Sequence, residues 1–249
     1  MLYVISRLLM LAMLTAVVQA TPIRLCHDDE TVRSDPSAHL ILMRELQRQS
    51  GHAIQLHGRA WTRCLAELRA DVWDGAVGAS FTPERAEMAI YPMKAGQPDA
   101  ALSLNIDSYS LYRLREGTAS WDGQRFSGIH GLVGVQRGYS IMNDLQAAQL
   151  TLDPSASSAG DNLRKLLAGR LVAAVLLSSD AEYAIQQHPD FQQRILRIDP
   201  PVVVKPFYLV FSRRFARQHP DVVQQLWQTL PAVRDSAAVR KAQMALRRK

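Results

Sequence analysis

The sequence predicts an α/β protein with two lobes joined by two extended crossings of the chain. Helix-like and strand-like patterns alternate twice, first over residues 23–79 and again over residues 132–187. Between the two runs lies a long stretch of alternating apolar residues, 100–113, and a similar stretch, 202–211, follows the second run. Both stretches are too long and too apolar for ordinary surface loops. We therefore expect both to be strands that carry the chain between the lobes.

The first 20 residues have the features of an export signal. Arg7 is the one positive side chain, residues 8–18 are apolar, and a small residue, Ala20, ends the segment. This order predicts a secretory signal peptide that is cleaved after Ala20, with the rest of the chain in the periplasm. The alternative is a transmembrane anchor, but the apolar run is shorter than the roughly 20 residues that span a bilayer.

The first alternating run predicts a mostly parallel sheet with helices on both faces. In chain order, its elements are strand 23–26, helix 40–49, strand 53–56, helix 61–69 and strand 74–79. Gly51 ends the first of these helices, because glycine commonly follows the last helical turn. A strand–helix–strand–helix–strand order of this kind is typical of open α/β sheets.

A polar turn, residues 80–85, follows the third strand. Its Thr82-Pro83 pair predicts the start of a helix, with Thr82 as the N-cap and Pro83 in the first helical position. Open α/β sheets bind ligands at the carboxyl ends of their strands. A fixed guanidinium there, that of Arg85, can bind both oxygens of a carboxylate. Ser80 and Thr82 would add hydroxyl groups, whereas the alternative is that Arg85 pairs with a surface acid.

The second alternating run predicts a second α/β lobe. Its elements are strand 132–136, turn 138–140, helix 141–148, helix 161–168, strand 171–177 and helix 180–187. The crossing at 202–211 then returns to the first lobe, where helices 220–230 and 233–244 pack. The predicted division is residues 21–106 plus 205–249 for lobe 1, and residues 107–204 for lobe 2.

Composition argues against several classes of partner. The net charge is +6, and the excess of basic residues is concentrated near the end of the chain, in residues 240–249. No basic stripe interleaved with aromatic residues appears elsewhere, so we interpret this end as a solvated tail and expect no nucleic-acid partner. No His or Cys residues stand at metal-ligand spacing. We therefore expect neither a metal nor a cofactor. We also expect the protein to be a monomer.

The chain has two cysteines, Cys26 and Cys64. Export to an oxidising compartment favours a disulfide. In the predicted fold, Cys26 lies near the end of the first strand and Cys64 in the first turn of the helix that follows the second strand. These places are neighbours, so we expect a Cys26–Cys64 bridge. The alternative is two buried free thiols.

Residues 61–85 resemble the lobe 1 segment of the bacterial periplasmic solute-binding proteins of the amino-acid type, family 3. The positions that fit the spacing of that family are Trp61, Leu65, Leu68, Asp74, Thr82 and Arg85. The resemblance extends, with varying strength, over most of the chain after the signal segment. It implies a type II periplasmic binding protein fold, in which two lobes close on a small solute by a hinge motion.

The resemblance also implies roles for residues of lobe 1. Arg85 would bind the carboxylate of the ligand, Thr82 and Ser80 would contribute further donors, and Trp61 would pack on the ligand. Asp28, close to the end of the first strand, would contact an amine or a side chain of the ligand. Trp61 as a core residue and Asp28 as a strand-end cap are the alternatives.

In lobe 2 the resemblance is partial. Ser140, in a Gly-Tyr-Ser turn, would supply a hydroxyl group to the ligand, and we also expect it to be the N-cap of the following helix. The position where family members carry an acid for the α-ammonium group is Leu177, and the nearest acid is Asp180. The resemblance therefore implies a carboxylate-bearing solute that is not an ordinary α-amino acid.

Three hypotheses for function follow. The first is a solute-binding protein that presents its ligand to an ABC permease or to a membrane sensor protein, and it agrees with the absence of a catalytic pattern. The second is a dehydratase-like periplasmic enzyme on the same fold, which would need a general acid from the cluster Asp28, Asp29 and Glu30. The third is a protein that has kept the fold and acts only through a protein partner.

Overall fold

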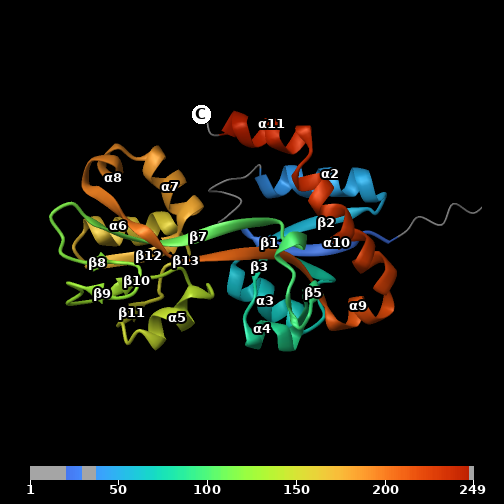
Figure 1. Ribbon diagram of the computed structural model, residues 1–249, viewed down its shortest axis with the longest axis horizontal. Coiled ribbons are helices and arrows are strands. Elements are labelled where there is room, and N and C mark those ends of the chain that lie inside the picture. The colour runs from blue at the N-terminus through green and yellow to red at the C-terminus, as the bar shows by residue number, and fades with distance from the viewer. Residues whose placement is uncertain (1–20, 30–37, 247–249) are drawn as a thin grey trace, which may run out of the picture.

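The structure, a computed structural model, describes residues 21–29 and 38–246, and the side chains up to residue 241. The predicted signal peptide, Glu30 and the last three residues lie outside this part. Within it, two groups of helices and strands lie side by side and are joined by two long strands (Figure 1). The helices described here are too short or too polar to span a lipid bilayer.

One sheet runs through both halves of the molecule. Its strands are ordered β11-β10-β12-β7-β13-β3-β1-β2. Their bounds are β1 (Ile23–Asp28), β2 (Ile54–Arg59), β3 (Gly75–Ser80), β7 (Asn105–Leu114), β10 (Val133–Gly134), β11 (Leu152–Asp153), β12 (Ala173–Leu177) and β13 (Ile195–Ser212). A short strand, β4 (Ala89–Ile90), pairs with the end of β13. Two small hairpins, β5 (Met93–Lys94) with β6 (Gln97–Pro98) and β8 (Ser120–Trp121) with β9 (Phe126–Ser127), lie outside this sheet.

Each end of the sheet is parallel, as expected for α/β units. β1 pairs in parallel with β2 and β3, and β10 pairs in parallel with β11 and β12. The two central strands, β7 and β13, are antiparallel to each other and to their outer neighbours. They are the two predicted crossings, and they pair along the junction, with Val203 opposite Tyr109 and Lys205 opposite Asp107. The lobe limits at residues 106/107 and 204/205 fall within this pairing and stay a prediction.

The helices cover both faces of the sheet (Figure 1). Their bounds are α2 (Ala38–Ser50), α3 (Trp61–Arg69), α4 (Pro83–Met88), α5 (Ile141–Ala147), α6 (Ala159–Leu167), α7 (Ser178–Gln187), α8 (Pro189–Arg194), α9 (Arg213–Gln218), α10 (Pro220–Arg234) and α11 (Ala237–Leu246), with a 3₁₀ turn, η1 (Ala100–Leu102). The sequence patterns predicted the longer helices to within a few residues. They did not predict α8 and α9, which have six residues each.

The buried apolar side chains form three groups. One lies in lobe 1, where α2 and α10 pack on the sheet, and another lies in lobe 2, between α6, α8 and β12. The third is shared by both lobes. It includes Trp61 and Tyr91 of lobe 1, Tyr139 and Leu177 of lobe 2, and Tyr109 of the crossing β7. The lobes therefore meet across a buried apolar surface.

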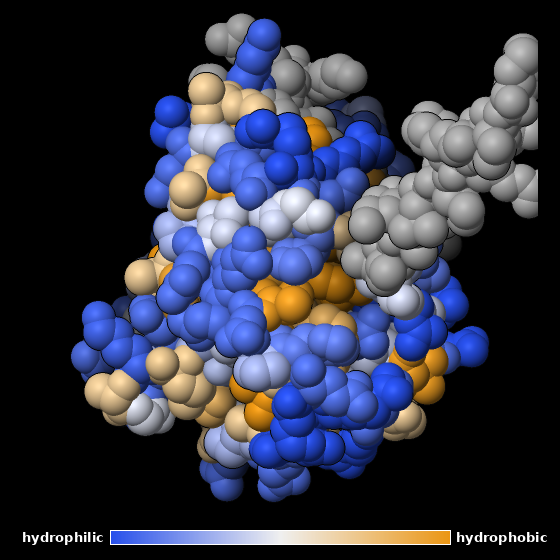
Figure 2. Space-filling view, turned by 90° about the vertical axis from the view of Figure 1, so that its right-hand side faces the viewer, coloured by the Kyte–Doolittle hydropathy of each residue, from blue (hydrophilic) through white to orange (hydrophobic). Residues whose placement is uncertain are grey.

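The outer end of lobe 1 is mainly hydrophilic. It has scattered apolar areas, one of them near its centre (Figure 2).

Cys26 and Cys64 form the expected disulfide. Their Cα atoms are 5.7 Å apart, inside the usual range for such a bridge. Both residues are fully buried. The bridge ties the end of β1 to the first turn of α3, so it fixes two segments that lead into the space between the lobes.

The beginnings of two helices at the junction of the lobes were both predicted to have capping residues. Thr82 caps α4 as expected: its hydroxyl oxygen accepts a hydrogen bond from the backbone N–H of Arg85, at 3.2 Å. For α5 the expectation was wrong. Ser140 has helical backbone angles and no capping hydrogen bond from its side chain. Its hydroxyl group turns to the other lobe instead.

Candidate functional site

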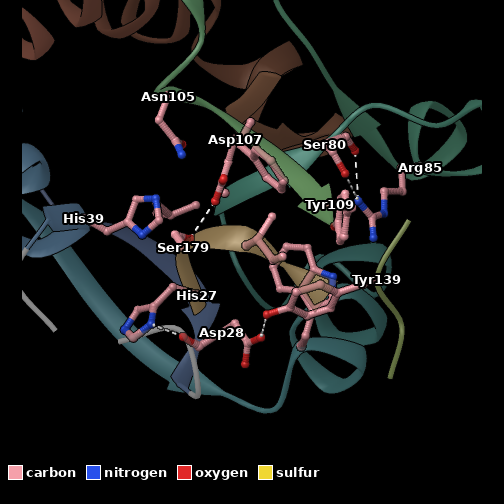
Figure 3. A pocket seen from close by; sticks show the side chains of 15 residues that line it. His27, Asp28, His39, Ser80, Arg85, Asn105, Asp107, Tyr109, Tyr139 and Ser179 are labelled. Carbon is pink, nitrogen blue, oxygen red and sulfur yellow. Dashed lines mark hydrogen bonds between the residues drawn. The ribbon is translucent and has the colours of Figure 1, made fainter. Parts of the chain in front are cut away.

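A cavity of about 50 Å³ lies between the lobes, near the ends of β1 and β3 and against β7 (Figure 3). Four of the six predicted ligand-binding residues line it, namely Asp28, Trp61, Ser80 and Arg85. Thr82 and Ser140 do not line it, although each contacts a residue that does. The lining residues that were not predicted as ligand contacts include His27, His39, Asn105, Asp107, Tyr109, Tyr139, Leu177, Ser179 and Phe207.

The guanidinium of Arg85 is held in a fixed position between the lobes. Only 6 % of this residue is exposed. Its Nη1 donates to the backbone oxygen and to Oγ of Ser80, both at 2.9 Å, and its Nη2 donates to the backbone oxygen of Gly138, also at 2.9 Å. The guanidinium also lies over the ring of Trp61, at 5.5 Å from the centroid, a cation–π distance. These contacts replace the surface ion pair that was the alternative for Arg85.

Ser80 and Ser140 meet across the lobes. Their Oγ atoms are 2.7 Å apart, and both residues are buried. The turn that carries Ser140 includes Gly138, whose positive φ of 77° favours glycine. A Cβ atom at Gly138 would lie 2.6 Å from Cγ2 of Thr62 in the other lobe. The turn can approach lobe 1 this closely only because residue 138 has no side chain.

A second contact between the lobes joins two acids through a tyrosine. The hydroxyl of Tyr139 donates to Oδ2 of Asp28 at 2.8 Å (Figure 3). It also lies 3.4 Å from Oδ2 of Asp180. Gln136 donates from Nε2 to the same oxygen of Asp180 at 2.8 Å. Burial raises the pKa of Asp180 to about 7, and the charges of Asp107 and Asp28 act in the same direction. Asp28 thus takes part in a contact between lobes and is more than a local cap.

The crossing strand β7 contributes polar groups that were not predicted as ligand contacts. Asp107 accepts hydrogen bonds from Oγ of Ser179, at 2.6 Å, and from the backbone N–H of Ser108, at 2.7 Å. Burial raises the pKa of Asp107. Asn105, two residues earlier, also lines the cavity. The alternation of side chains along a strand could have identified residues 105, 107 and 109 as one face, had the site been sought on the crossing.

His27 and Leu177 complete the environment of the cavity. Burial lowers the pKa of His27, so the ring is mainly neutral at neutral pH, and its Nδ1 lies 3.1 Å from the backbone oxygen of Asp28. Leu177 lines the cavity at the position where the resemblance would place an acid. The wall is therefore apolar at this point, and the nearby carboxylate, Asp180, is oriented towards Gln136 and Tyr139.

The cavity has a cationic side and an acidic side. Arg85 and Ser80 lie on one side, whereas Asp107, Ser179 and Asp28 lie across from them or below them (Figure 3). Among the described residues, no group of three or more His, Cys, Asp or Glu side chains is arranged to hold a metal ion. The arrangement can accept a small polar molecule that carries a negative group, a positive group or both.

Comparison with known proteins shows what the fold is. No protein-family model matches the chain, and the search of curated proteins finds no match. A histidine kinase sensor domain with similarity to periplasmic binding proteins is similar in structure, with a TM-score of 0.69 and 16 % identity, and the match covers 90 % of this chain and 95 % of that one. An amino acid ABC transporter substrate-binding protein from Streptococcus pneumoniae, bound to L-arginine, gives a TM-score of 0.70 at 13 % identity and covers 90 % and 94 %.

A third similar structure is an ancestral amino-acid-binding protein that is a precursor of cyclohexadienyl dehydratase. It gives a TM-score of 0.67 at 14 % identity, and the match covers 90 % of this chain and 95 % of that one. At identities this low, the structural similarity establishes a common fold and no more. The expected two-lobed periplasmic binding protein fold is thus confirmed.

Proposed function

We propose that this protein is a monomeric periplasmic solute-binding protein, whose lobes close on a small polar solute that carries a carboxylate. The observation that carries the proposal is the buried guanidinium of Arg85, which lines the cavity between the lobes. Burying a charge is costly unless it is paired, so a buried guanidinium aimed at a cavity suits an anionic ligand. The similar structures include transport and sensor proteins, and an ABC permease and a membrane sensor are both candidate partners.

Binding would require the lobes to part. A cavity of about 50 Å³ has room for only a few water molecules and not for a molecule of amino-acid size. Opening would break the contact of Arg85 Nη2 with Gly138 and that of Ser80 with Ser140. The carboxylate of the solute would then take the place of the Gly138 oxygen beside Arg85. Ser80 Oγ, Ser140 Oγ and the face of Trp61 would form the rest of this subsite.

Arg85→Ala tests the proposal directly. Loss of a buried, charge-assisted contact costs roughly 2–5 kcal/mol, or about 30-fold to several thousand-fold in affinity. Calorimetry on the chain from Thr21 onwards, titrated with a panel of small carboxylates and α-amino acids, measures it. The control is Arg217→Ala, because Arg217 is exposed on α9 and does not line the cavity.

Two results would contradict the proposal. Unchanged affinity for the bound carboxylate in Arg85→Ala would remove Arg85 from the site. Micromolar or tighter binding of a standard α-amino acid would refute the specificity, since the proposal assigns no carboxylate to an α-ammonium group at Leu177.

An enzyme on the same fold is the second candidate, and one observation favours it. Asp180 has a pKa raised to about 7 and contacts Tyr139, which lines the cavity. A carboxyl group that keeps its proton near neutral pH can act as a general acid. Asp180, however, reaches the cavity only through Tyr139. Conversion of a bound solute, followed by mass spectrometry and abolished by Asp180→Asn, would support this candidate over simple binding.

A further inference from the structure

The crossing strand β7 presents two oxygen acceptors to the cavity. Asn105 and Asp107 are two residues apart on the strand, and both line the cavity (Figure 3). Oδ1 of Asn105 is buried, and among the described residues it has no hydrogen-bond partner. A buried acceptor without a donor costs on the order of 1–3 kcal/mol, so its presence in a cavity wall indicates a missing donor.

The carboxylate of Asp107 has capacity for a further donor. Oδ2 accepts a hydrogen bond from the hydroxyl of Ser179, Oδ1 accepts one from the N–H of Ser108, and the backbone N–H of Ser179 also donates to this carboxylate. A carboxylate has about four acceptor sites, so the three bonds do not saturate it. All three donors are neutral, and they do not cancel the negative charge of this largely buried group.

The nearest lysine in the sheet does not neutralise this charge. Lys205 lies opposite Asp107 in the pairing of β13 with β7. Its ammonium group pairs with Asp144 of α5 instead, at 2.6 Å. The charge of His39 lowers the pKa of Asp107, but this effect is the smallest of its causes, well behind burial. The wall formed by β7 therefore favours a cationic donor from the solute.

The two charged walls lie on different sides of the cavity. Arg85 stands on one side with Ser80, and Asp107 stands across from it with Asn105 and Ser179 (Figure 3). The wall contributed by Leu177 is apolar. A ligand that satisfies this arrangement has its carboxylate and its amine at opposite ends, with a short apolar segment between them.

We infer that Asn105 and Asp107 bind the ammonium group of a solute whose carboxylate is bound by Arg85, so that the ligand is an ω-amino carboxylate. The inference rests on the proposed function and specifies its substrate class. On closure, the ammonium group donates to Oδ1 of Asn105 and to the carboxylate of Asp107. The solute thereby contacts the strand that joins the lobes as well as both lobes.

A series of four-carbon probes tests the inference. Butyrate carries the carboxylate alone, 2-aminobutyrate adds an α-amine, 4-aminobutyrate adds a distal amine, and butylamine carries the amine alone. In calorimetry on the chain from Thr21 onwards, the best of 3-aminopropanoate, 4-aminobutyrate and 5-aminopentanoate is expected to bind at least tenfold more tightly than butyrate, 2-aminobutyrate or butylamine. The three lengths are needed because the optimal separation of the two groups is set by the closed form.

The variant Asp107→Asn keeps the shape of the side chain and removes its charge. It is expected to lower the ratio of ω-amino carboxylate affinity to butyrate affinity to near one. Asp190→Asn, an exposed aspartate on α8, is the matched control and keeps the ratio of the unchanged protein. Asn105→Leu removes the amide group of Asn105, whose oxygen has no partner among the described residues, so it provides a second variant that is expected to fold, with a ratio at least threefold lower.

The outcomes separate the two proposals. Arg85-dependent binding of carboxylates without preference for a distal amine would overturn this inference and leave the proposed function standing. The same holds if Asp107→Asn keeps the full ratio. If no carboxylate of the series binds, both proposals fail.

Discussion

At the scale of single residues, Asp180 shows how a buried carboxyl group responds to its neighbours. It is 3 % exposed, and Gln136 and Tyr139 surround its Oδ2. The other oxygen, Oδ1, is buried without a hydrogen-bond partner among the described residues. A protonated carboxyl group suits such surroundings better than a carboxylate, which agrees with a pKa of about 7.

Asp180→Asn is therefore expected to change the pH dependence of stability. Because the folded pKa lies above the ordinary value of 3.8, the contribution of Asp180 to stability is fully present below about pH 4 and is lost as the pH rises through about 7. Asparagine cannot ionise. The free energy of unfolding of the variant minus that of the unchanged protein should therefore be larger at pH 8 than at pH 5, by on the order of 1–3 kcal/mol.

Urea unfolding at pH 5 and pH 8 measures this effect. Comparing the two proteins at the same pH cancels the titration of His27, whose lowered pKa acts in the opposite direction. Asp190→Asn serves as control, because an exposed aspartate should leave the pH dependence unchanged. Parallel curves for Asp180→Asn and the unchanged protein would show that Asp180 ionises normally.

Local signals in the sequence predicted part of the cavity wall. Ser80 and Arg85 belong to one turn, and both reach the cavity, since a capped helix start fixes the direction of the side chains around it. The contact of Tyr139 with Asp28 could not be predicted, because it joins residues 111 positions apart and exists only when the lobes meet. Ser140 was wrongly predicted as a cap for the same reason: the hydroxyl of Ser80 lies within its reach.

At the scale of elements, the disulfide joins two segments that contribute to the cavity. β1 ends in His27 and Asp28, and α3 begins with Trp61. The bridge is next to both in the chain, since Cys26 directly precedes His27 and Cys64 lies three residues after Trp61. It thus holds the acidic end of β1 and the aromatic side chain below Arg85 at a constant separation.

Replacing both cysteines by alanine is expected to destabilise the protein. The bridge closes a loop with a sequence separation of 38, for which the chain-entropy argument gives about 4 kcal/mol and measured bridges typically give about 2–4 kcal/mol. Urea unfolding with and without a reductant measures the loss. The reductant should lower the stability of the unchanged protein towards that of the double variant and should leave the variant as it is. Equal stability of the two proteins under oxidising conditions would contradict a stabilising bridge.

Element length explains which segments the patterns could predict. α3 and α10 have complete amphipathic turns, whereas α8 and α9 have six residues each, hardly more than one period. β13 is longer than predicted. It runs through Pro200 and Pro201, which normally indicate a break, because the pairing with β7 shifts its register between Ile198 and Val203 and leaves the prolines outside the ladder.

At the scale of the whole molecule, a shared apolar surface and polar contacts beside the cavity hold the lobes together. The polar contacts are Ser80 with Ser140, Arg85 with Gly138, and Tyr139 with Asp28. The first two would be exchanged for ligand contacts on binding. The second and the third each involve a buried charged group, so these two should weigh most in the free-energy difference between closed and open forms.

Tyr139→Phe is expected to shift the protein without ligand towards an open form. The change removes a hydrogen bond to a charged group, worth about 1.5–3 kcal/mol, and leaves the aromatic packing in place. Small-angle scattering should then give a larger radius of gyration than for the unchanged protein. Tyr183→Phe, at an exposed position of α7, is the matched control. Identical radii for Tyr139→Phe and the control would show that this contact does not govern closure.

The position of β13 also affects how the protein can be made. It fills the middle of the sheet between β7 and β3, yet its partner residues in β3, such as Val77 opposite Leu209, are translated more than a hundred residues earlier. Until β13 leaves the ribosome, β3 and β7 both present bare edges to which other chains can add. Neither lobe can therefore be completed early in synthesis. A nascent chain of this design keeps both edges bare until β13 has been translated, so it would require protection from aggregation up to that point.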